Sequence, residues 1–276
     1  MTRLTIGTAT RNEFDGCYFT VQAAGLYHPE VSDVEFVVVD NDPNGPCADA
    51  LRALASSKPN LRYIPCNDLS GSAVIRNVIF EHAQGEVVLV LDSHVLVAPG
   101  GIAAIMAYFD ARPGCRDLVQ GPLLSDDLES PFASYKLEWH AGYFGRWGVD
   151  PRGSDVHAPP FEIEMQGLGL FACRKDAWVG FNPGFSGYGG AEGYIHEKFR
   201  RAGGRVMCLP AARWIHRHAR PNGLPYAMSW EDRIRNYLIG YRELDIDPSP
   251  MEEHMRAYLG DEAFDRIYTA IKESLS

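Results

Sequence analysis

VVLVLDSH, residues 87–94, is the stretch that decides the fold. Its five consecutive apolar residues, rich in β-branched side chains, predict a strand buried on both faces of a sheet. Asp92 and His94 follow two residues apart, so their side chains point the same way if the chain stays extended. Ligands of α/β proteins bind at the edge of the sheet where the strands end, and a carboxylate with an imidazole at that edge can hold a divalent cation. Alternatively, Asp92 caps the next turn and His94 lies on the surface.

The residues before this stretch predict strands that alternate with helices. This order is typical of a parallel sheet with helices on both faces. Polar residues end three of the strands, at Thr10, Asp40 and Asp92, and parallel strands bring these ends to one edge. The first strand is followed by neither a dinucleotide-binding GxGxxG nor a Walker loop. The expected strands are 4–10, 34–42, 61–66 and 87–94, and the expected helices are 12–26, 48–57, 70–84 and 100–111.

The second half is less regular. Strands are expected at 118–124, within 167–178 and at 205–210, and a helix is expected at 192–202. Residues 125–165 are rich in aromatic side chains and interrupted by Gly and Pro, which predicts a long irregular segment of functional importance. Three helical stretches follow Ser229.

Composition sets broad limits on the class of protein. The 276 residues carry a formal net charge of −10, which disfavours a general polyanion binder but leaves room for local basic clusters. No apolar run reaches the roughly 18–20 residues that span a bilayer, and the first residues do not resemble a signal peptide. The six cysteines form no CxxC pair, so a zinc knuckle is not expected. Together these features favour a soluble protein of the cytosol.

Four motifs in order carry a resemblance to a known family. They are DSH at 92–94, MQGLGLFACRKDAW at 165–178, FNPGFSGYGGAE at 181–192 and RAGGRVMCLPAARWIHRH at 201–218. The chain resembles the nucleotide-sugar glycosyltransferases of family 2 type over about residues 3–220. It is most similar to the branch of the polypeptide N-acetylgalactosaminyltransferases and chondroitin-type polymerases, which use Asp-x-His. The resemblance implies a GT-A fold, a Rossmann-like, mostly parallel sheet with helices on both faces.

The resemblance also implies a metal site. Asp92, His94 and His216, six residues after Pro210, match its ligands. A carboxylate with two imidazoles suits Mn²⁺, whereas Mg²⁺ prefers oxygen ligands. His218 is the neighbour that could be mistaken for the third ligand, and a surface basic cluster is the alternative for the His-Arg-His run. Arg217 or Arg220 could add positive charge near a diphosphate.

Further positions match the family's donor site. A nucleoside-diphosphate sugar, with uracil as the expected base, would contact residues at strand ends, on the helix after residue 70 and in the glycine-containing motifs. For Arg76, an ordinary helix arginine is the alternative. The residues are Thr10, Arg11, Asp40, Arg76, Asp92, Gln166, Gly167 and Gly190.

Glu192 matches the family position that separates two stereochemical outcomes. Inverting members carry an acid there, so the resemblance implies an inverting hexosyltransferase with Glu192 as general base. Ala191 departs from the family's acid at the preceding position. A one-residue slip would make Glu192 a substrate-binding residue, and a helix N-terminal cap is a further alternative. Trp139, Trp147 and Tyr188 are candidates for an acceptor platform, with core packing as the alternative.

Two other function classes remain open at this point. One is an inactive relative that binds nucleotide sugars, motivated by Ala191, and the other is a metal-dependent nucleotidyltransferase. The acceptor is a glycan, a protein or a hydroxymethylated nucleobase in DNA. The expected domains are 1–220 for the glycosyltransferase unit, split into a nucleotide-binding half (1–120) and an acceptor half (121–220), and 221–276 for a helical C-terminal cap.

Overall fold

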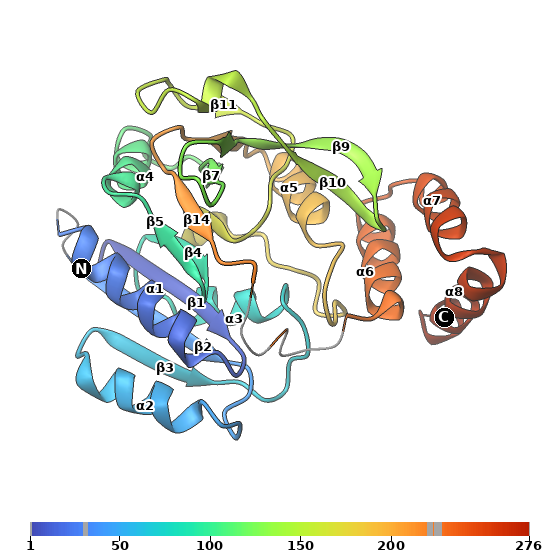
Figure 1. Ribbon diagram of the computed structural model, residues 1–276, viewed down its shortest axis with the longest axis horizontal. Coiled ribbons are helices and arrows are strands. Elements are labelled where there is room, and N and C mark those ends of the chain that lie inside the picture. Colours follow the sequence, from blue (N-terminus) through green and yellow to red (C-terminus); the bar gives the residue numbers. More distant parts are fainter. Residues whose placement is uncertain (1, 30–32, 220–222, 224–227, 276) are drawn as a thin grey trace.

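The computed structural model describes residues 2–29, 33–219, 223 and 228–275. Its first half alternates strands and helices, as expected from the sequence (Figure 1). The four strands run parallel, and the register pairs Thr10 with Asp40 and Ala9 with Asp92, so their carboxyl ends lie level at one edge. The elements are β1 (Leu4–Thr10), α1 (Phe14–Tyr27), β2 (Val34–Asp40), α2 (Ala48–Ser57), β3 (Leu61–Pro65), α3 (Ile75–His82) and β4 (Val87–Asp92).

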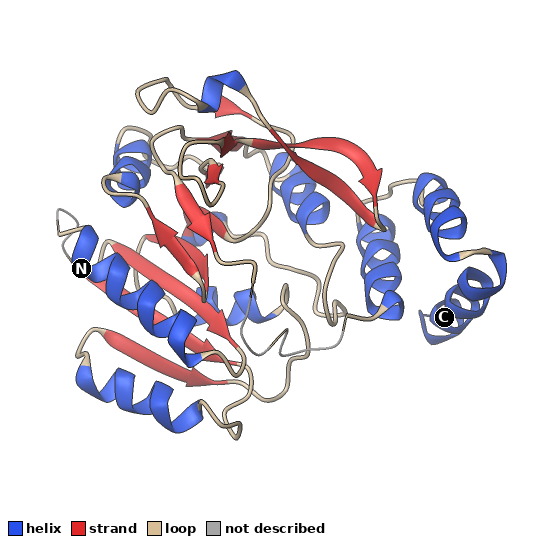
Figure 2. Cartoon of the chain, viewed as in Figure 1, coloured by secondary structure: helices blue, strands red, loops and turns tan. Residues whose placement is uncertain are grey.

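Strand β4 is buried on both faces, which confirms the interpretation of its apolar run. Leu89 and Leu91 belong to the hydrophobic core that includes α1, α2 and α4 (Gly101–Asp110). Val88 and Val90 belong to a second core on the opposite face, which includes α3 and α5 (Glu192–Arg201). Figure 2 shows the helices on the two faces of the sheet.

The second half makes the sheet mixed. Antiparallel β12 (Leu170–Arg174) lies between β4 and β6 (Leu118–Gln120). Strand β13 (Val206–Cys208) is parallel to β6, and β11 (Phe161–Glu162) is antiparallel to β13. The eight strands follow the order β11-β13-β6-β12-β4-β1-β2-β3. Six of the eight strands run in the same direction and β11 and β12 run opposite to them, which confirms the mostly parallel sheet predicted from the sequence.

A smaller sheet carries the end of the His-Arg-His motif. It consists of β5 (Val95–Val97), β14 (Trp214–His216), β7 (Leu123–Leu124) and β8 (Pro131–Phe132), with β14 between β5 and β7. The pairing of β14 with β5 places His216 opposite Val95, the residue after His94. Trp214 is 1% exposed and donates a hydrogen bond from Nε1 to the Gly121 carbonyl at 2.7 Å, which anchors β14.

Part of the segment expected to be irregular is a β-hairpin. Strands β9 (Ser134–His140) and β10 (Tyr143–Gly148) pair antiparallel around a turn at Ala141 and Gly142, both with positive φ. The alternation of apolar and polar residues that predicts a strand is present in β9, where apolar residues alternate with Lys136 and Glu138. The turn dipeptide Ala-Gly is a weak hairpin signal, since Asn or Asp is favoured at its first position.

Three C-terminal helices confirm the prediction for the residues after Ser229. They are α6 (Trp230–Glu243), α7 (Ser249–Leu259) and α8 (Asp261–Leu275), packed around a core that includes Met251, Met255 and Phe264. Helix α6 lies beside the hairpin and α5 (Figure 1). Two short 3₁₀ turns complete the elements, Pro151–Gly153 and Lys175–Ala177. None of the helices in the described part of the chain is long and apolar enough to cross a membrane.

Gly121 provides a test of the packing between the two sheets. A Cβ at this buried position would lie 1.8 Å from the backbone oxygen of Ala212, which no small shift can relieve. We expect Gly121→Ala to lower the free energy of unfolding by about 1–3 kcal/mol, measured by urea denaturation. The control is Gly25→Ala on α1, where the added carbon would come no closer than 3.4 Å to a side-chain atom and the change should stay within about 1 kcal/mol. Equal stability of the Gly121 variant and the wild type would contradict the packing.

Candidate active site

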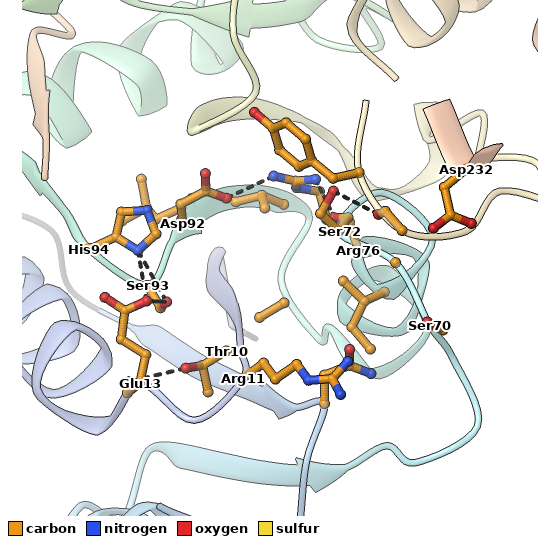
Figure 3. A pocket seen from close by; sticks show the side chains of 18 residues that line it. Thr10, Arg11, Glu13, Ser70, Ser72, Arg76, Asp92, Ser93, His94 and Asp232 are labelled. Carbon is orange, nitrogen blue, oxygen red and sulfur yellow. Dashed lines mark hydrogen bonds and ion pairs between the residues drawn. The ribbon is translucent and has the colours of Figure 1, made fainter. Parts of the chain in front are cut away.

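The first cavity lies at the carboxyl ends of β1 and β4 and has a volume of about 370 Å³. Figure 3 shows Thr10 and Arg11 on one side of it and Asp92 with Arg76 on the other. Ser70–Ser72, before α3, and the loop residues Gly187 and Tyr188 complete its walls. The cavity is therefore built at the sheet edge where α/β proteins bind ligands.

Three residues at the edge of this cavity form a candidate metal site. Asp92, His94 and His216 each offer a ligand atom, and these atoms all lie within 4.8 Å of one another. The Nε2 atoms of the two imidazoles are 3.0 Å apart, and His216 Nε2 is 3.6 Å from Asp92 Oδ2. One oxygen and two nitrogen donors that converge in this way fit a first-row divalent ion such as Mn²⁺. The structure thus brings together the three ligands predicted from the sequence.

Arg76 fixes the carboxylate of this cluster. Its guanidinium lies 2.7 Å from Asp92 Oδ1, and the arginine is 8% exposed. Burial alone would raise the pKa of Asp92, but Arg76, His216 and His94 outweigh it and hold that pKa well below its usual range. Asp92 is therefore ionised at neutral pH, as a metal ligand must be.

Glu13 is a member of the site that the sequence did not reveal. Its Oε2 lies 3.2 Å from His94 Nδ1, and its other oxygen pairs with Arg217 (Figure 3 shows the contact with His94). A carboxylate on the far nitrogen of a ligating histidine fixes the ring and its tautomer, leaving Nε2 to face the metal. Arg217 is thus held by Glu13, while Arg220 lies outside the described residues.

Several of the predicted donor residues line the first cavity, but Asp40 does not. Asp40 is 1% exposed and accepts hydrogen bonds from the Tyr63 hydroxyl at 2.7 Å and from the Asp42 backbone N–H. Burial, followed by the hydrogen bond to Asp40, raises the pKa of Tyr63 to about 12. It is the next residue, Asn41, that lines the cavity. The predicted donor residues on the wall are Thr10, Arg11, Arg76 and Asp92.

Two of the predicted donor residues, Gln166 and Gly167, line neither this cavity nor the second one described below. Gln166 is fully buried and donates to the Ala133 carbonyl at 2.7 Å. A Cβ on Gly167 would lie 2.6 Å from the ring of Trp147, and that ring packs edge-on against Trp214. The structure therefore places Trp147 in packing contacts, the alternative left open by the sequence.

Glu192, Gly190 and Trp139 line a second cavity of about 310 Å³, while Tyr188 lines the first. Burial raises the pKa of the Glu192 carboxyl, Arg76 opposes the rise and Asp92 adds to it. Arg76 and Asp92 line the first cavity, so charges in that cavity act on Glu192, which itself lines the second cavity.

The fold and this site define the class of the protein. Residues 5–154 match the family described as "Glycosyl transferase family 2", and the chain belongs to that family. The arrangement is the GT-A fold expected from the sequence.

The curated relatives of this chain include polypeptide N-acetylgalactosaminyltransferases, the branch that its motifs resemble. The chain is 24% identical over 245 residues to "Polypeptide N-acetylgalactosaminyltransferase 10" of Homo sapiens and of Mus musculus, covering 77% of this chain and 40% of each relative. It therefore spans less than half the length of these curated relatives.

Solved structures show the same fold. The crystal structure of GalNAc-T7 with UDP, GalNAc and Mn²⁺ superposes with a TM-score of 0.68 at 16% identity, covering 88% of this chain and 48% of the other. Mannosyltransferase PcManGT from Pyrobaculum calidifontis, in complex with GDP-Man and Mn²⁺, gives a TM-score of 0.55 at 18% identity, covering 99% and 74%.

Substitution of the two histidines tests the metal site. We expect His94→Ala and His216→Ala each to weaken Mn²⁺ binding by at least about 100-fold, because loss of an outer partner alone costs about 10- to 100-fold. Isothermal titration with Mn²⁺ measures the effect. His218→Ala is the matched control, since this exposed neighbour lies outside the cluster of converging ligand atoms. Loss of binding in the control but not in the other two variants would overturn the assignment.

Glu13→Gln tests the outer partner. The amide keeps the shape but removes the charge that orients His94, so Mn²⁺ affinity should fall by about 10- to 100-fold while the fold persists. Asp15→Asn, an exposed acid two residues further on in α1, should leave the affinity unchanged. The role of Glu13 is wrong if its variant binds Mn²⁺ as tightly as the wild type.

Proposed function

We propose that the protein is a Mn²⁺-dependent glycosyltransferase that moves a hexosyl group from a UDP-sugar to an acceptor hydroxyl. The observation that carries the proposal is the convergence of Asp92, His94 and His216 beside a cavity of ligand size, whose wall includes Asp92 and His94. Family membership supports it, as do relatives whose structures were solved with UDP or GDP-Man and Mn²⁺.

The protein's own residues divide the work of donor binding. A metal held by the three ligands would neutralise the charge that develops on the diphosphate as it leaves. Thr10 and Arg11 lie at the end of β1, on the opposite wall from Asp92, and would contact the nucleoside (Figure 3). Arg76 orients the metal-binding carboxylate through its ion pair with Asp92, so its role in donor binding is positioning.

Glu192 is the proposed general base of an inverting displacement. The acceptor oxygen would form a bond to the anomeric carbon as the bond from that carbon to the diphosphate breaks, and the hydroxyl proton would pass to the Glu192 carboxylate. A carboxyl with a raised pKa is a better proton acceptor than an exposed one, because the ionised form is poorly solvated.

Glu192→Gln tests the base. We expect kcat to fall by about 10²- to 10⁴-fold while UDP affinity in Mn²⁺ stays within about twofold, measured by transfer assays and titration. NMR of the product should show the anomeric configuration inverted relative to the donor. Glu262→Gln, an exposed acid at the start of α8, is the control with unchanged kcat. A retained configuration would exclude the proposed displacement.

The raised pKa of Glu192 also predicts a pH dependence. Only the ionised carboxylate accepts a proton, so kcat/KM should be lost as pH falls through the pKa of Glu192, and the midpoint should lie above the ordinary value of 4.5. A profile of kcat/KM between pH 4 and 8, corrected for metal binding, measures the midpoint. The acidic limb should vanish in Glu192→Gln.

A further inference from the structure

A second cavity lies beneath the β9–β10 hairpin, between α5, α6 and the start of α7. Its volume of about 310 Å³ is at the lower end of small-ligand pockets, roughly 300–1,000 Å³. Figure 1 shows the hairpin beside α5 and α6, with α7 following. The C-terminal helices therefore form one wall of a cavity as well as packing against one another.

Two segments line both cavities, so the cavities are neighbours. In the loop before α5, Gly187 and Tyr188 line the first cavity and Gly190 lines the second, as does Glu192, the first residue of α5. The loop turns between them at Gly189 and Gly190, where φ is +104° and +79°. Helix α6 behaves in the same way, because Asp232 lines the first cavity and residues 237, 240 and 241 line the second.

Aromatic rings form much of the second cavity's surface. Trp139 and Phe144 come from the hairpin, and Tyr237 and Tyr241 come from α6. Flat rings of this kind pack against the apolar faces of sugar rings, and their polar tips supply hydrogen bonds. Among the described residues, neither Trp139 Nε1 nor the Tyr241 hydroxyl makes a side-chain hydrogen bond, and one face of the Trp139 ring stacks on His254.

The charge of the lining is predominantly negative. Four acids line the cavity against one base, Arg200, which is held by Glu197 at 3.0 Å and by the Glu164 carbonyl at 2.7 Å. Carboxylates and phosphates would meet repulsion here, whereas hydroxyls and ammonium groups would find acceptors. The acids are Glu164, Glu192, Glu197 and Asp247.

We propose that this second cavity is the acceptor site and that it takes the terminal ring of a neutral or amine-bearing saccharide. The assignment rests on the proposed function, because Glu192 would take the proton of the acceptor hydroxyl as that hydroxyl attacks a donor sugar in the first cavity. The four acids of the lining disfavour nucleic acid and other anionic acceptors, and the cavity volume of about 310 Å³ disfavours an extended peptide.

Gly193 offers a way to fill the cavity without disturbing the donor site. It lies in the first turn of α5, and a Cβ there would meet nothing closer than Met165 Sδ at 3.8 Å. Gly193→Leu therefore places a side chain in the cavity and removes a helix-destabilising glycine. Gly193→Ala adds only one carbon, and Gly25→Leu, at an exposed position of α1, is a control that lines neither of the two cavities.

The experiment is saturation-transfer NMR on the full chain loaded with UDP and Zn²⁺, a diamagnetic ion that takes histidine and carboxylate ligands and does not broaden the ligand signals as Mn²⁺ would. The probes are methyl glucoside, methyl glucosaminide, methyl glucuronide and a short threonine-containing peptide. We expect signal from the first two glycosides and at least about 10-fold weaker binding of the glucuronide and the peptide. Gly193→Leu should remove the glycoside signal, Gly193→Ala should weaken it, and Gly25→Leu should leave it intact.

Each contrary result has a defined meaning. Absence of Mn²⁺-dependent UDP binding in the wild type would refute the proposed function itself. Three results would overturn the acceptor site alone, provided that UDP binds. They are the absence of a glycoside signal, a preference for the glucuronide or the peptide, and an unchanged glycoside signal in Gly193→Leu. Circular dichroism of the Leu variant and its UDP affinity, expected within about twofold of wild type, separate cavity filling from misfolding.

Discussion

The pairing of β14 with β5 is the constraint on which the site depends. His94 and His216 are 122 residues apart in sequence, and the ladder between these strands brings their Nε2 atoms within 3.0 Å. A shift of this ladder by one residue would turn His216 to the opposite face of the small sheet. Burial of the Trp214 ring, with its hydrogen bond to Gly121, locks the register. The metal site is therefore a consequence of sheet packing as much as of its three ligands.

The chemistry is arranged around one wall shared by two cavities. The segment from Gly187 to Gly193, which is the loop before α5 and its first two residues, borders the first cavity on one side and the second cavity on the other. Glu192 begins α5 in this wall. It lines the second cavity, and its pKa responds to Arg76 and Asp92 of the first cavity. The proposed displacement needs the acceptor oxygen and the leaving diphosphate on opposite sides of the anomeric carbon, and two cavities on either side of one wall would hold them in that way.

Local signals in the sequence predicted much of this arrangement, but not its long-range parts. Helix α2 has the predicted bounds, 48–57, and the buried run of β4 was recognised because apolar periodicity is a local property. Helix α3 begins at Ile75, later than predicted, because Gly71 and Ser72 instead make backbone contacts with Gly187 from a distant loop. No local pattern announces such a contact.

The same distinction applies to the site. The candidate metal ligands were identified through the spacing of motifs that resemble the family, whereas Glu13 contacts His94 across 81 residues of sequence and has no motif of its own. Asp40 was placed at a strand end correctly, yet the hydrogen bond from Tyr63 keeps its carboxylate out of the cavity. Strand ends are predictable from sequence, but the direction of a side chain at the end depends on neighbouring strands.

The most direct measurement of the central claim is a crystal structure of the protein with Mn²⁺ and UDP, with anomalous scattering recorded to locate the ion. The account predicts one strong anomalous peak, from an ion bonded to Asp92, His94 and His216 and to the UDP diphosphate. It also predicts that the nucleoside lies beside Thr10 and Arg11. An ion bound elsewhere, or UDP bound with no ion at these three residues, would contradict it.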